Sequence, residues 1–220
     1  MIVVEDVHKR YMTRRGMGPW VLRGVNINIP ARRSVGLIGA NGSGKSTLLR
    51  IIGGADYPNK GRVERRCRVS WPMGNGGLEG TLSGRQNARF ICRIHGHHGD
   101  LAQRLERIQD FAELGAAFED PVHTYSSGMR SRLQFALSLA FDFEVYISDE
   151  VTSAGDAAFR KKAADAFRKL ADQASIIMTS HDESTLKTFC QSGIWLGGGK
   201  AVWFDQIDDA LCTYKESITR

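Results

Sequence analysis

The sequence lacks the residue patterns that build zinc sites, disulfide frameworks or membrane spans. Its four cysteines are scattered with no C-x-x-C pair, which argues against a zinc site and fits thiols that stay reduced. The best apolar stretch, 137–147, is broken by Asp142 and Glu144, and no signal peptide opens the chain. We therefore expect a protein that does not span a membrane and that folds as one domain over residues 1–220.

Positive charge is in excess. The 30 Lys and Arg residues against 24 Asp and Glu give a net charge of +6, which suits an acidic lipid surface, an anionic substrate or nucleic acid equally well. Charge alone therefore selects no function. Two groups of arginines, one in an expected strand and one in an expected helix, are predicted to be solvated faces and not binding patches. They are Arg62, Arg65, Arg66 and Arg68, and Arg85, Arg89 and Arg93.

A glycine-rich loop stands between two apolar runs, 35–38 and 48–52. The first run is expected to be a buried strand and the second to lie in a helix. Glycines let the loop turn successive N–H groups inward, and the helix adds the positive end of its dipole. This spacing is that of a phosphate-binding Walker A loop, so the sequence predicts a nucleoside triphosphate site. The loop residues are Gly39, Ala40, Asn41, Gly42, Ser43, Gly44, Lys45, Ser46 and Thr47.

The last loop residues have distinct chemical roles. Lys45 supplies a charge that reaches the β- and γ-phosphates, and the Ser46 hydroxyl is a ligand for Mg²⁺. A Gly/Ser surface turn with a chance lysine would need neither the strand before it nor the helix after it. The expected cofactors are therefore a nucleoside triphosphate and Mg²⁺.

Strand and helix patterns alternate along most of the chain. Segments 2–7 and 25–29 alternate apolar and polar residues, as half-buried antiparallel strands do. Segment 61–70 reads as another strand, and the Pro/Gly-rich residues 72–77 are not expected to be regular. Later strands, such as 175–179, alternate with helices, which predicts a parallel sheet with ligands at its carboxyl edge.

Residues from about 82 to 120 carry helical patterns alone. Asp100 is a predicted N-cap there, and Ser126–Gly128 begin another helix with small residues that let an anion approach. The predicted fold is α/β, of the P-loop NTPase type. It has a mainly parallel core sheet, an antiparallel β subdomain and a helical subdomain of about 82–140 inserted in the nucleotide-binding core.

Two carboxylates and a histidine complete the candidate active site. Asp149 and Glu150 end the apolar run 145–148 at the carboxyl edge of a buried strand, where the phosphates are expected. Asp149 is placed to hold Mg²⁺ through water, and Glu150 to orient and deprotonate the attacking water. His181 ends the next strand at the same edge, where it can contact the γ-phosphate. The expected catalytic residues are Glu150, His181 and Lys45.

The order of these motifs resembles the ATP-binding subunits of ABC transporters over nearly the whole chain. The segment Val145–Asp149 matches Walker B, Ser153–Asp156 resembles the D-loop, and His181 is the switch histidine. Tyr11 stands where that family stacks an aromatic ring on adenine. The resemblance thus implies that the nucleotide is ATP. It also implies an ABC-type nucleotide-binding domain whose further nucleotide contacts are Tyr11, Ser126, Ser127, Gly128 and Asp156.

Two motifs depart from the family pattern. The signature, usually Leu-Ser-Gly-Gly-Gln, is Tyr-Ser-Ser-Gly-Met at 125–129, with Ser126 and Gly128 in register. The Q-loop glutamine is missing, and Ser70–Gly74 stand in its place. The altered signature is similar to that of polysaccharide and teichoic-acid exporters. The Ser-Trp-Pro segment, with Gly84–Asn87 after it, resembles the bacterial group 2 capsular polysaccharide exporters of the polysialic acid type.

That resemblance implies an ATPase subunit that drives capsular polysaccharide across the bacterial inner membrane. It would be a peripheral protein on the cytoplasmic side, held by two copies of an integral membrane permease. It would also be a homodimer, because in this family Ser126 and Gly128 of one copy complete the γ-phosphate site of the other. The short chain after the hairpin at 194–204 also favours the capsule type, since O-antigen and teichoic-acid ATPases commonly carry an added domain there.

Three alternatives stay open on the sequence. The cargo could instead be O-antigen, teichoic acid or another glycolipid. A soluble ABC protein acting on nucleic acid or ribosomes usually has two cassettes, whereas this chain has one glycine loop and one acidic pair, so no nucleic-acid partner is expected. A module that binds ATP without hydrolysing it would not need Glu150 and His181.

Overall fold

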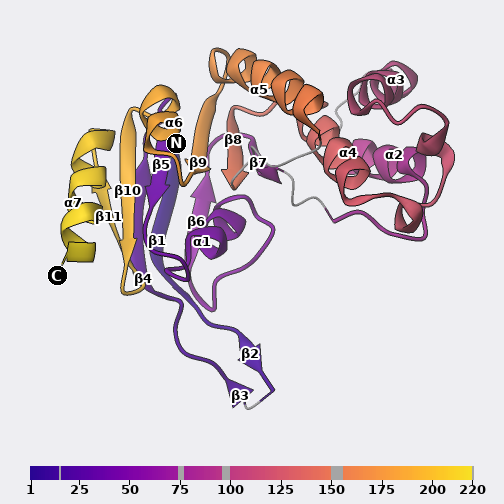
Figure 1. Ribbon diagram of the computed structural model, residues 1–220. Coiled ribbons are helices and arrows are strands. Elements are labelled where there is room, and N and C mark those ends of the chain that lie inside the picture. Colours follow the sequence, from indigo (N-terminus) through magenta and orange to yellow (C-terminus); the bar gives the residue numbers. More distant parts are fainter. Residues whose placement is uncertain (15, 74–76, 96–99, 150–155, 220) are drawn as a thin grey trace. The chain divides into compact units, whose positions relative to one another are not determined.

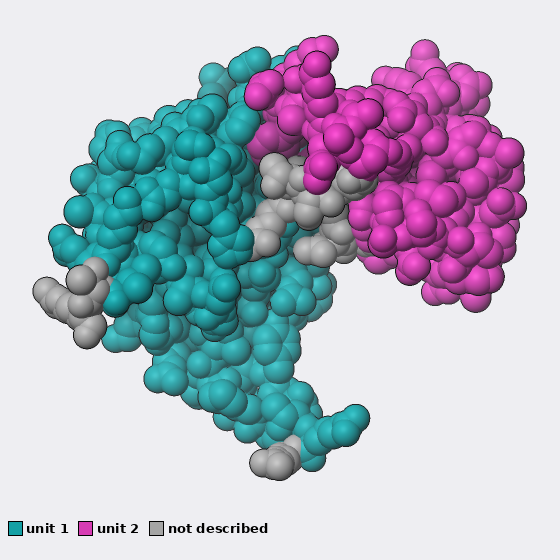
Figure 2. Space-filling model, viewed as in Figure 1, with its two compact units in different colours: residues 1–72, 143–150, 171–220 teal, residues 73–142, 151–170 magenta. Residues whose placement is uncertain are grey.

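The computed structural model of the protein describes residues 1–14, 16–73, 77–95, 100–149 and 156–219. The chain divides into two compact units (Figure 2). Unit 1 consists of residues 1–72, 143–150 and 171–220. Unit 2 consists of residues 73–142 and 151–170.

A six-stranded sheet forms the centre of unit 1, in the order β11-β10-β5-β9-β8-β7 (Figure 1). The pairs β10/β5, β5/β9 and β8/β9 are parallel, and β10/β11 is an antiparallel hairpin. The predicted, mainly parallel core sheet is therefore confirmed. Its strands are β5 Val35–Ile38, β7 Val69–Met73, β8 Val145–Asp149, β9 Ser175–Thr179, β10 Ser192–Gly197 and β11 Lys200–Phe204.

The antiparallel subdomain is a three-stranded sheet in the order β4-β1-β6. The predicted antiparallel strands at 2–7 and 25–29 are confirmed, and they pair with each other, with Ile2 opposite Ile29 and Val4 opposite Ile27. A short hairpin of β2 and β3 extends from it. These strands are β1 Ile2–Lys9, β2 Met12–Thr13, β3 Gly16–Met17, β4 Leu22–Ile29 and β6 Lys60–Arg65.

Helices flank the sheets of unit 1 and form most of the described part of unit 2. Those of unit 1 are α1 Lys45–Ile52, α6 Glu183–Phe189 and α7 Ile207–Thr219. Those of unit 2 are α2 Gly84–His95, α3 Leu101–Ala112, α4 Ser127–Leu139 and α5 Ala157–Ala171, with 3₁₀ turns η1 Gly115–Glu119 and η2 Val122–Thr124. None of the described helices combines the length and the apolar character needed to cross a membrane.

Two expectations about the segment around residue 70 are wrong. The expected strand 61–70 is two strands in different sheets, because the backbone of Arg66 bonds to Met1 while that of Arg68 bonds to the Glu144 side chain. Pro72 and Met73, expected to be irregular, belong to β7. A proline fits there because β7 is the edge strand of its sheet.

The arginine groups are only partly solvated. Arg62 and Arg66 lie at the surface and pair with neighbouring carboxylates, as expected. Arg65 instead donates from Nε to the carbonyl of Ile52 at 2.6 Å, so it binds a carbonyl at the C-terminal end of α1. Arg85 pairs with Glu119 at 2.5 Å. The expectation of a solvated face therefore holds for Arg65, which is exposed although it bonds to α1, and is met only in part by the half-buried Arg85.

Helix α7 packs so closely on the central sheet that β10 has room only for a glycine. A Cβ on Gly193 would lie 2.4 Å from the Cβ of Ala210, which cannot rotate away because it is fixed to the helix backbone. The buried Ala210 and Leu211 thereby bring one face of α7 onto the strands that carry the candidate site.

We predict that Gly193→Ala lowers the free energy of unfolding by about 1–3 kcal/mol, because α7 has to move away from the sheet. The matched control is Gly77→Ala, since a Cβ there meets nothing within 4 Å. The control should change stability by less than about 1 kcal/mol. Urea unfolding curves followed by tryptophan fluorescence measure both, and equal midpoints for the two variants would contradict the close packing.

Candidate nucleotide-binding site

The glycine loop connects β5 to α1 at the carboxyl edge of the central sheet. Gly44, the N-cap of α1, has φ of 104°, a conformation that glycine adopts without strain. Gly39 allows a close approach, because a Cβ there would lie 2.4 Å from the carbonyl oxygen of Leu196. Gly44 offers no side-chain oxygen to the first turn of α1, so the N–H groups of that turn suit an anion from outside the helix.

Two polar side chains of the loop face its interior. The Lys45 ammonium donates to the carbonyls of Gly39 at 2.8 Å and Ala40 at 3.0 Å, which holds it over the loop. The Ser43 hydroxyl is buried and makes no hydrogen bond to any described residue. A buried hydroxyl normally has a partner, so Ser43 fits a loop built to hold phosphate oxygens. Ser46 is exposed on the first turn of α1, and Thr47 is buried behind it.

Tyr11 is held beside the loop by residues far away in the sequence. Its hydroxyl donates to Asp56 at 2.9 Å and lies 3.3 Å from the hydroxyl oxygen of Thr47. Asp56 also accepts from Lys9 at 2.5 Å. Burial raises the pKa of Asp56, but the hydrogen bonds from Lys9 and Tyr11 outweigh it and hold the pKa below its ordinary value. The ring of Tyr11 is thus fixed by a charged pair while the residue stays 38% exposed.

Asp149 ends β8 and lies opposite Thr179 of the parallel strand β9. The buried Thr179 hydroxyl donates to Asp149 Oδ1 at 2.8 Å, which orients the carboxylate. Sequence reasoning missed Thr179, although its place at the end of the neighbouring strand was a usable signal. No group of three or more His, Cys, Asp or Glu side chains that could hold a metal ion occurs among the described residues.

A cavity of about 120 Å³ joins the loop to the end of β9. Lys45 and His181, predicted from separate motifs, both line it. Helix α7 also reaches this cavity through Leu211 and Tyr214, which the sequence did not suggest. The structure therefore brings together the loop, Thr179 with its bonded Asp149, and His181. The cavity is lined by Leu37, Ile38, Gly39, Lys45, Thr179, Ser180, His181, Glu183, Leu186, Leu211 and Tyr214.

The remaining predicted site residues belong to unit 2 or lie outside the described residues. Glu150 and D-loop residues 153–155 are outside them. Ser126 caps α4, its side chain accepting from the Met129 N–H at 3.1 Å. Ser127 is exposed at the start of α4, and a Cβ on Gly128 would make an ordinary van der Waals contact, 3.8 Å from the Ser126 hydroxyl oxygen.

The altered signature has a structural explanation at its first position. Tyr125 is buried, and its hydroxyl donates to the carbonyl of Ala117 at 2.6 Å. A Cβ on Gly84 would lie 2.4 Å from that hydroxyl, so α2 needs a glycine there. The large Tyr125 side chain therefore anchors the segment that leads into Ser126.

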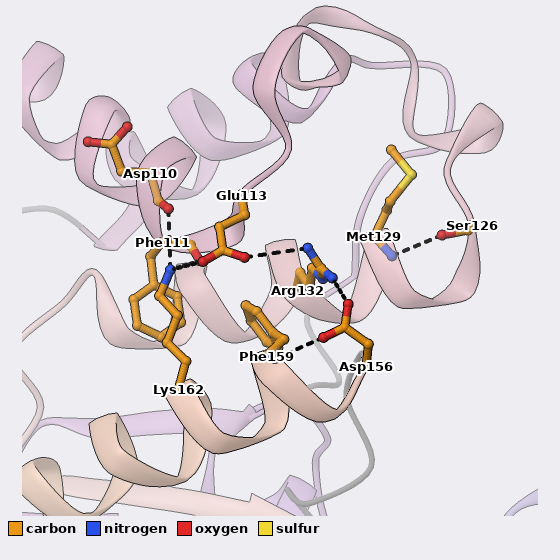
Figure 3. A network of polar contacts seen from close by, with 9 residues as sticks. All are labelled: Asp110, Phe111, Glu113, Ser126, Met129, Arg132, Asp156, Phe159 and Lys162. Carbon is orange, nitrogen blue, oxygen red and sulfur yellow. Dashed lines mark hydrogen bonds and ion pairs between the residues drawn. The ribbon is translucent and has the colours of Figure 1, made fainter.

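Asp156 caps α5, accepting from the Phe159 N–H at 2.9 Å, and it pairs with Arg132 of α4 (Figure 3). The hydrogen bond from the Phe159 N–H contributes most to holding the pKa of Asp156 below its ordinary value. The predicted D-loop residue is therefore fixed to the signature helix by an arginine that the sequence analysis did not single out.

Loop, strand edge and cavity together define a P-loop nucleotide-binding protein. Residues 22–153 match the ABC transporter family. The polysialic acid transport ATP-binding protein KpsT of Escherichia coli is 43% identical to this chain, and the match covers 99% of the chain and 100% of KpsT. The chain belongs to the ABC transporter family and is an ATPase of that family.

Two further similarities agree with this. The capsule polysaccharide export ATP-binding protein CtrD of Neisseria meningitidis is 41% identical over 97% of this chain and 98% of CtrD. A solved structure, described as a dimeric post-hydrolysis state of the ATP-binding cassette MJ0796 bound to ADP and Pi, is 24% identical with a TM-score of 0.73. It covers 94% of this chain and 99% of its own, and it supports the fold.

Asp182 immediately follows His181 and caps α6. Hydrogen bonds from Ser184 and Thr185 lower its pKa from 3.8 to about 2. A carboxyl with a depressed pKa stabilises the fold above its unfolded pKa and loses this effect as the pH falls through the folded value.

We predict that Asp182→Ala is less stable than the wild type at neutral pH, because α6 loses its cap. The difference should shrink as the pH falls from 3.8 through about 2, where the wild-type carboxyl becomes protonated. Urea midpoints of both proteins across this range measure it. A difference that stays constant across that range would show that the charge of Asp182 does not matter.

Proposed function

We propose that this protein is the ATP-hydrolysing subunit of an exporter that drives capsular polysaccharide across the bacterial inner membrane. The observation that carries the proposal is the match, from end to end, to two proteins named for polysialic acid transport and capsule polysaccharide export. The glycine loop, Asp149 and His181, at the carboxyl edge of the central sheet, are groups that such a subunit would use to bind and hydrolyse ATP.

ATP is proposed to bind with its phosphates in the glycine loop 39–47. Lys45 contacts the β- and γ-phosphates, Ser43 offers its buried hydroxyl, and Tyr11 stacks on adenine. Mg²⁺, held by Ser46 and through water by Asp149, would supply charge neutralisation at the phosphates. The hydrogen bond from Thr179 keeps Asp149 oriented for that role.

Hydrolysis is assigned to two residues after the strand ends. Glu150 is the proposed general base that orients and deprotonates water. His181, on the wall of the cavity with Lys45, is proposed to contact the γ-phosphate. Two copies of the chain would complete each site, with Ser126, Ser127 and Gly128 of one facing the nucleotide of the other and Asp156 close by. The dimeric ABC cassette of similar fold supports this arrangement.

A membrane path for a polymer implies an integral permease, and we propose that two copies of one hold this chain as a peripheral protein on the cytoplasmic side. Helix α2 of unit 2 suits such a contact. Phe90 and Ile94, 59% and 58% exposed, directly follow the exposed Arg89 and Arg93 in the sequence and lie on its surface beside them. Large exposed apolar side chains beside charged ones are typical of protein contacts.

We predict that Lys45 and Glu150 fail differently. Lys45→Ala should lose nucleotide affinity as well as turnover, because a phosphate-binding charge is removed. Glu150→Gln should keep ATP binding, lose about 10²-fold or more in hydrolysis, and accumulate an ATP-bound dimer. Equilibrium nucleotide binding and size-exclusion chromatography in ATP measure both. Near-normal turnover of Glu150→Gln would remove it from the role of base.

We predict that Glu150→Gln separates attachment from export in cells. Coexpressed with its permease, the variant should stay bound to membranes while surface polysaccharide disappears. The protein expressed alone should be largely released by high salt, since attraction of about 1 kcal/mol per well-placed Lys or Arg is screened. Normal surface capsule in the variant strain would contradict the proposed function, and loss of O-antigen or teichoic acid instead would change the cargo.

A further inference from the structure

Three helices of unit 2 meet over an aromatic cluster and are joined at its rim by four charged side chains (Figure 3). The rings of Phe111, Phe135 and Phe159, one each from α3, α4 and α5, lie 5.9–6.3 Å apart between centroids. The hydrophobic effect that brings such rings together is non-directional. Directional ion pairs at the rim can fix the register of the helices.

Glu113 is the centre of the charged rim. Its carboxylate accepts from Lys162 of α5 at 2.6 Å and lies 3.6 Å from a guanidinium nitrogen of Arg132 of α4. Lys162 also donates to the carbonyl of Phe111 at 3.0 Å, at the end of α3. Glu113 follows α3 with φ of 53°, a left-handed conformation that is unfavourable for a residue with a Cβ. Side-chain contacts to two other helices offset that strain.

Arg132 connects Glu113 to Asp156, one of the residues predicted to face the nucleotide. Its side chain is 20% exposed, and its guanidinium lies 5.1 Å from the ring centroid of Phe159. It pairs with Asp156, the N-cap of α5, and α4 itself begins at the N-cap Ser126. Fixing Arg132 therefore fixes the start of α5 relative to the start of the signature helix.

We propose that Glu113, Arg132 and Lys162 form a positioning network, which sets Ser126 and Asp156 in the relation that ATP hydrolysis requires. None of the three touches nucleotide. They act by holding α3, α4 and α5 in one register, so their loss should lower turnover while ATP affinity, which depends on unit 1, stays constant. The proposal rests on the proposed function, in which Ser126 and Gly128 of one copy complete the site of the other.

The chain offers a matched control in the same unit. Arg85 pairs with Glu119 at 2.5 Å, and its guanidinium lies 5.1 Å from the ring centroid of Phe118. Glu119 is as exposed as Glu113, with side-chain values of 56% and 50%. The Arg85–Glu119 pair joins α2 to η1 and includes no residue of α4 or α5. Glu119→Gln therefore removes a similar ion pair without touching the network.

The test compares Glu113→Gln with Glu119→Gln in the full chain, by steady-state ATP hydrolysis, ATP binding and urea unfolding. We expect Glu113→Gln to lower kcat by about threefold to tenfold with unchanged ATP affinity, because two charged contacts are lost together. Glu119→Gln should leave kcat within about twofold of the wild type. Arg132→Lys, which keeps the charge, should retain more activity than Arg132→Gln.

Further variants distinguish an effect on helix register from a loss of stability and from a failure of the proposed function. Glu113→Gly removes the left-handed strain, so it should be at least as stable as Glu113→Gln and still lose turnover. Unchanged kcat in Glu113→Gln, or equal losses in both glutamine variants, would overturn the network.

Gly128→Asp, which sets a carboxylate against the partner's nucleotide, should abolish turnover and spare ATP binding. If Gly128→Asp is active, the shared site itself fails, and the network with it. If only Glu113→Gln is active, the network alone fails.

Discussion

Helix α1 and the loop before it depend on the burial of four aliphatic side chains. Leu48, Leu49, Ile51 and Ile52 are each 0% exposed in the core shared with β1, β4, β5 and β8. An eight-residue helix is marginal on its own, so this burial, about 1.5–3 kcal/mol per side chain, is what maintains it. Arg65 binds carbonyls at its C-terminal end, whereas Gly44 leaves its N-terminal end without a side-chain cap. Packing against the sheets thus stabilises α1, and the N–H groups at its N-terminal end point where phosphate is expected.

The same design recurs around the loop, where residues outside every motif hold the motif residues. Tyr11 is fixed by Asp56 and Lys9, and Asp149 by Thr179. Asp56 accepts from the Tyr11 hydroxyl and the buried Thr179 hydroxyl donates to Asp149, so a hydrogen bond within the protein restricts each of these side chains. Lys9 is only 8% exposed, so its charge requires the Asp56 carboxylate close by. A polar group that is already oriented needs little rearrangement when charge develops beside it.

Short sequence patterns correctly predicted those parts of the fold that depend on residues close together in the sequence. The alternation in 2–7 and 25–29, the glycine loop and the cap at Asp100 all rest on short stretches, and the structure has them as expected. The expectation failed where partners come from elsewhere in the chain. The strand 61–70 splits because Met1 and Glu144 bind its middle. No pattern near Tyr11 indicates that it bonds to Asp56, and none near Arg132 indicates that it pairs with Glu113. Among the predicted site residues, the loop, Asp149 and His181 meet at one edge, and the place of Glu150 lies outside the described residues.

The contacts of unit 2 also separate two kinds of role among residues predicted to face the nucleotide. The Ser126 hydroxyl accepts from the Met129 N–H, and a hydroxyl that accepts still has its own hydrogen to donate. Capping α4 is therefore compatible with a hydrogen bond from Ser126 to a phosphate oxygen. Asp156 differs, because an ionised carboxylate only accepts, and it is already committed to the Phe159 N–H and to Arg132. A carboxylate would also repel phosphate. Chemistry thus favours Ser126 as the residue that would touch nucleotide and Asp156 as a residue that fixes the start of α5 to α4.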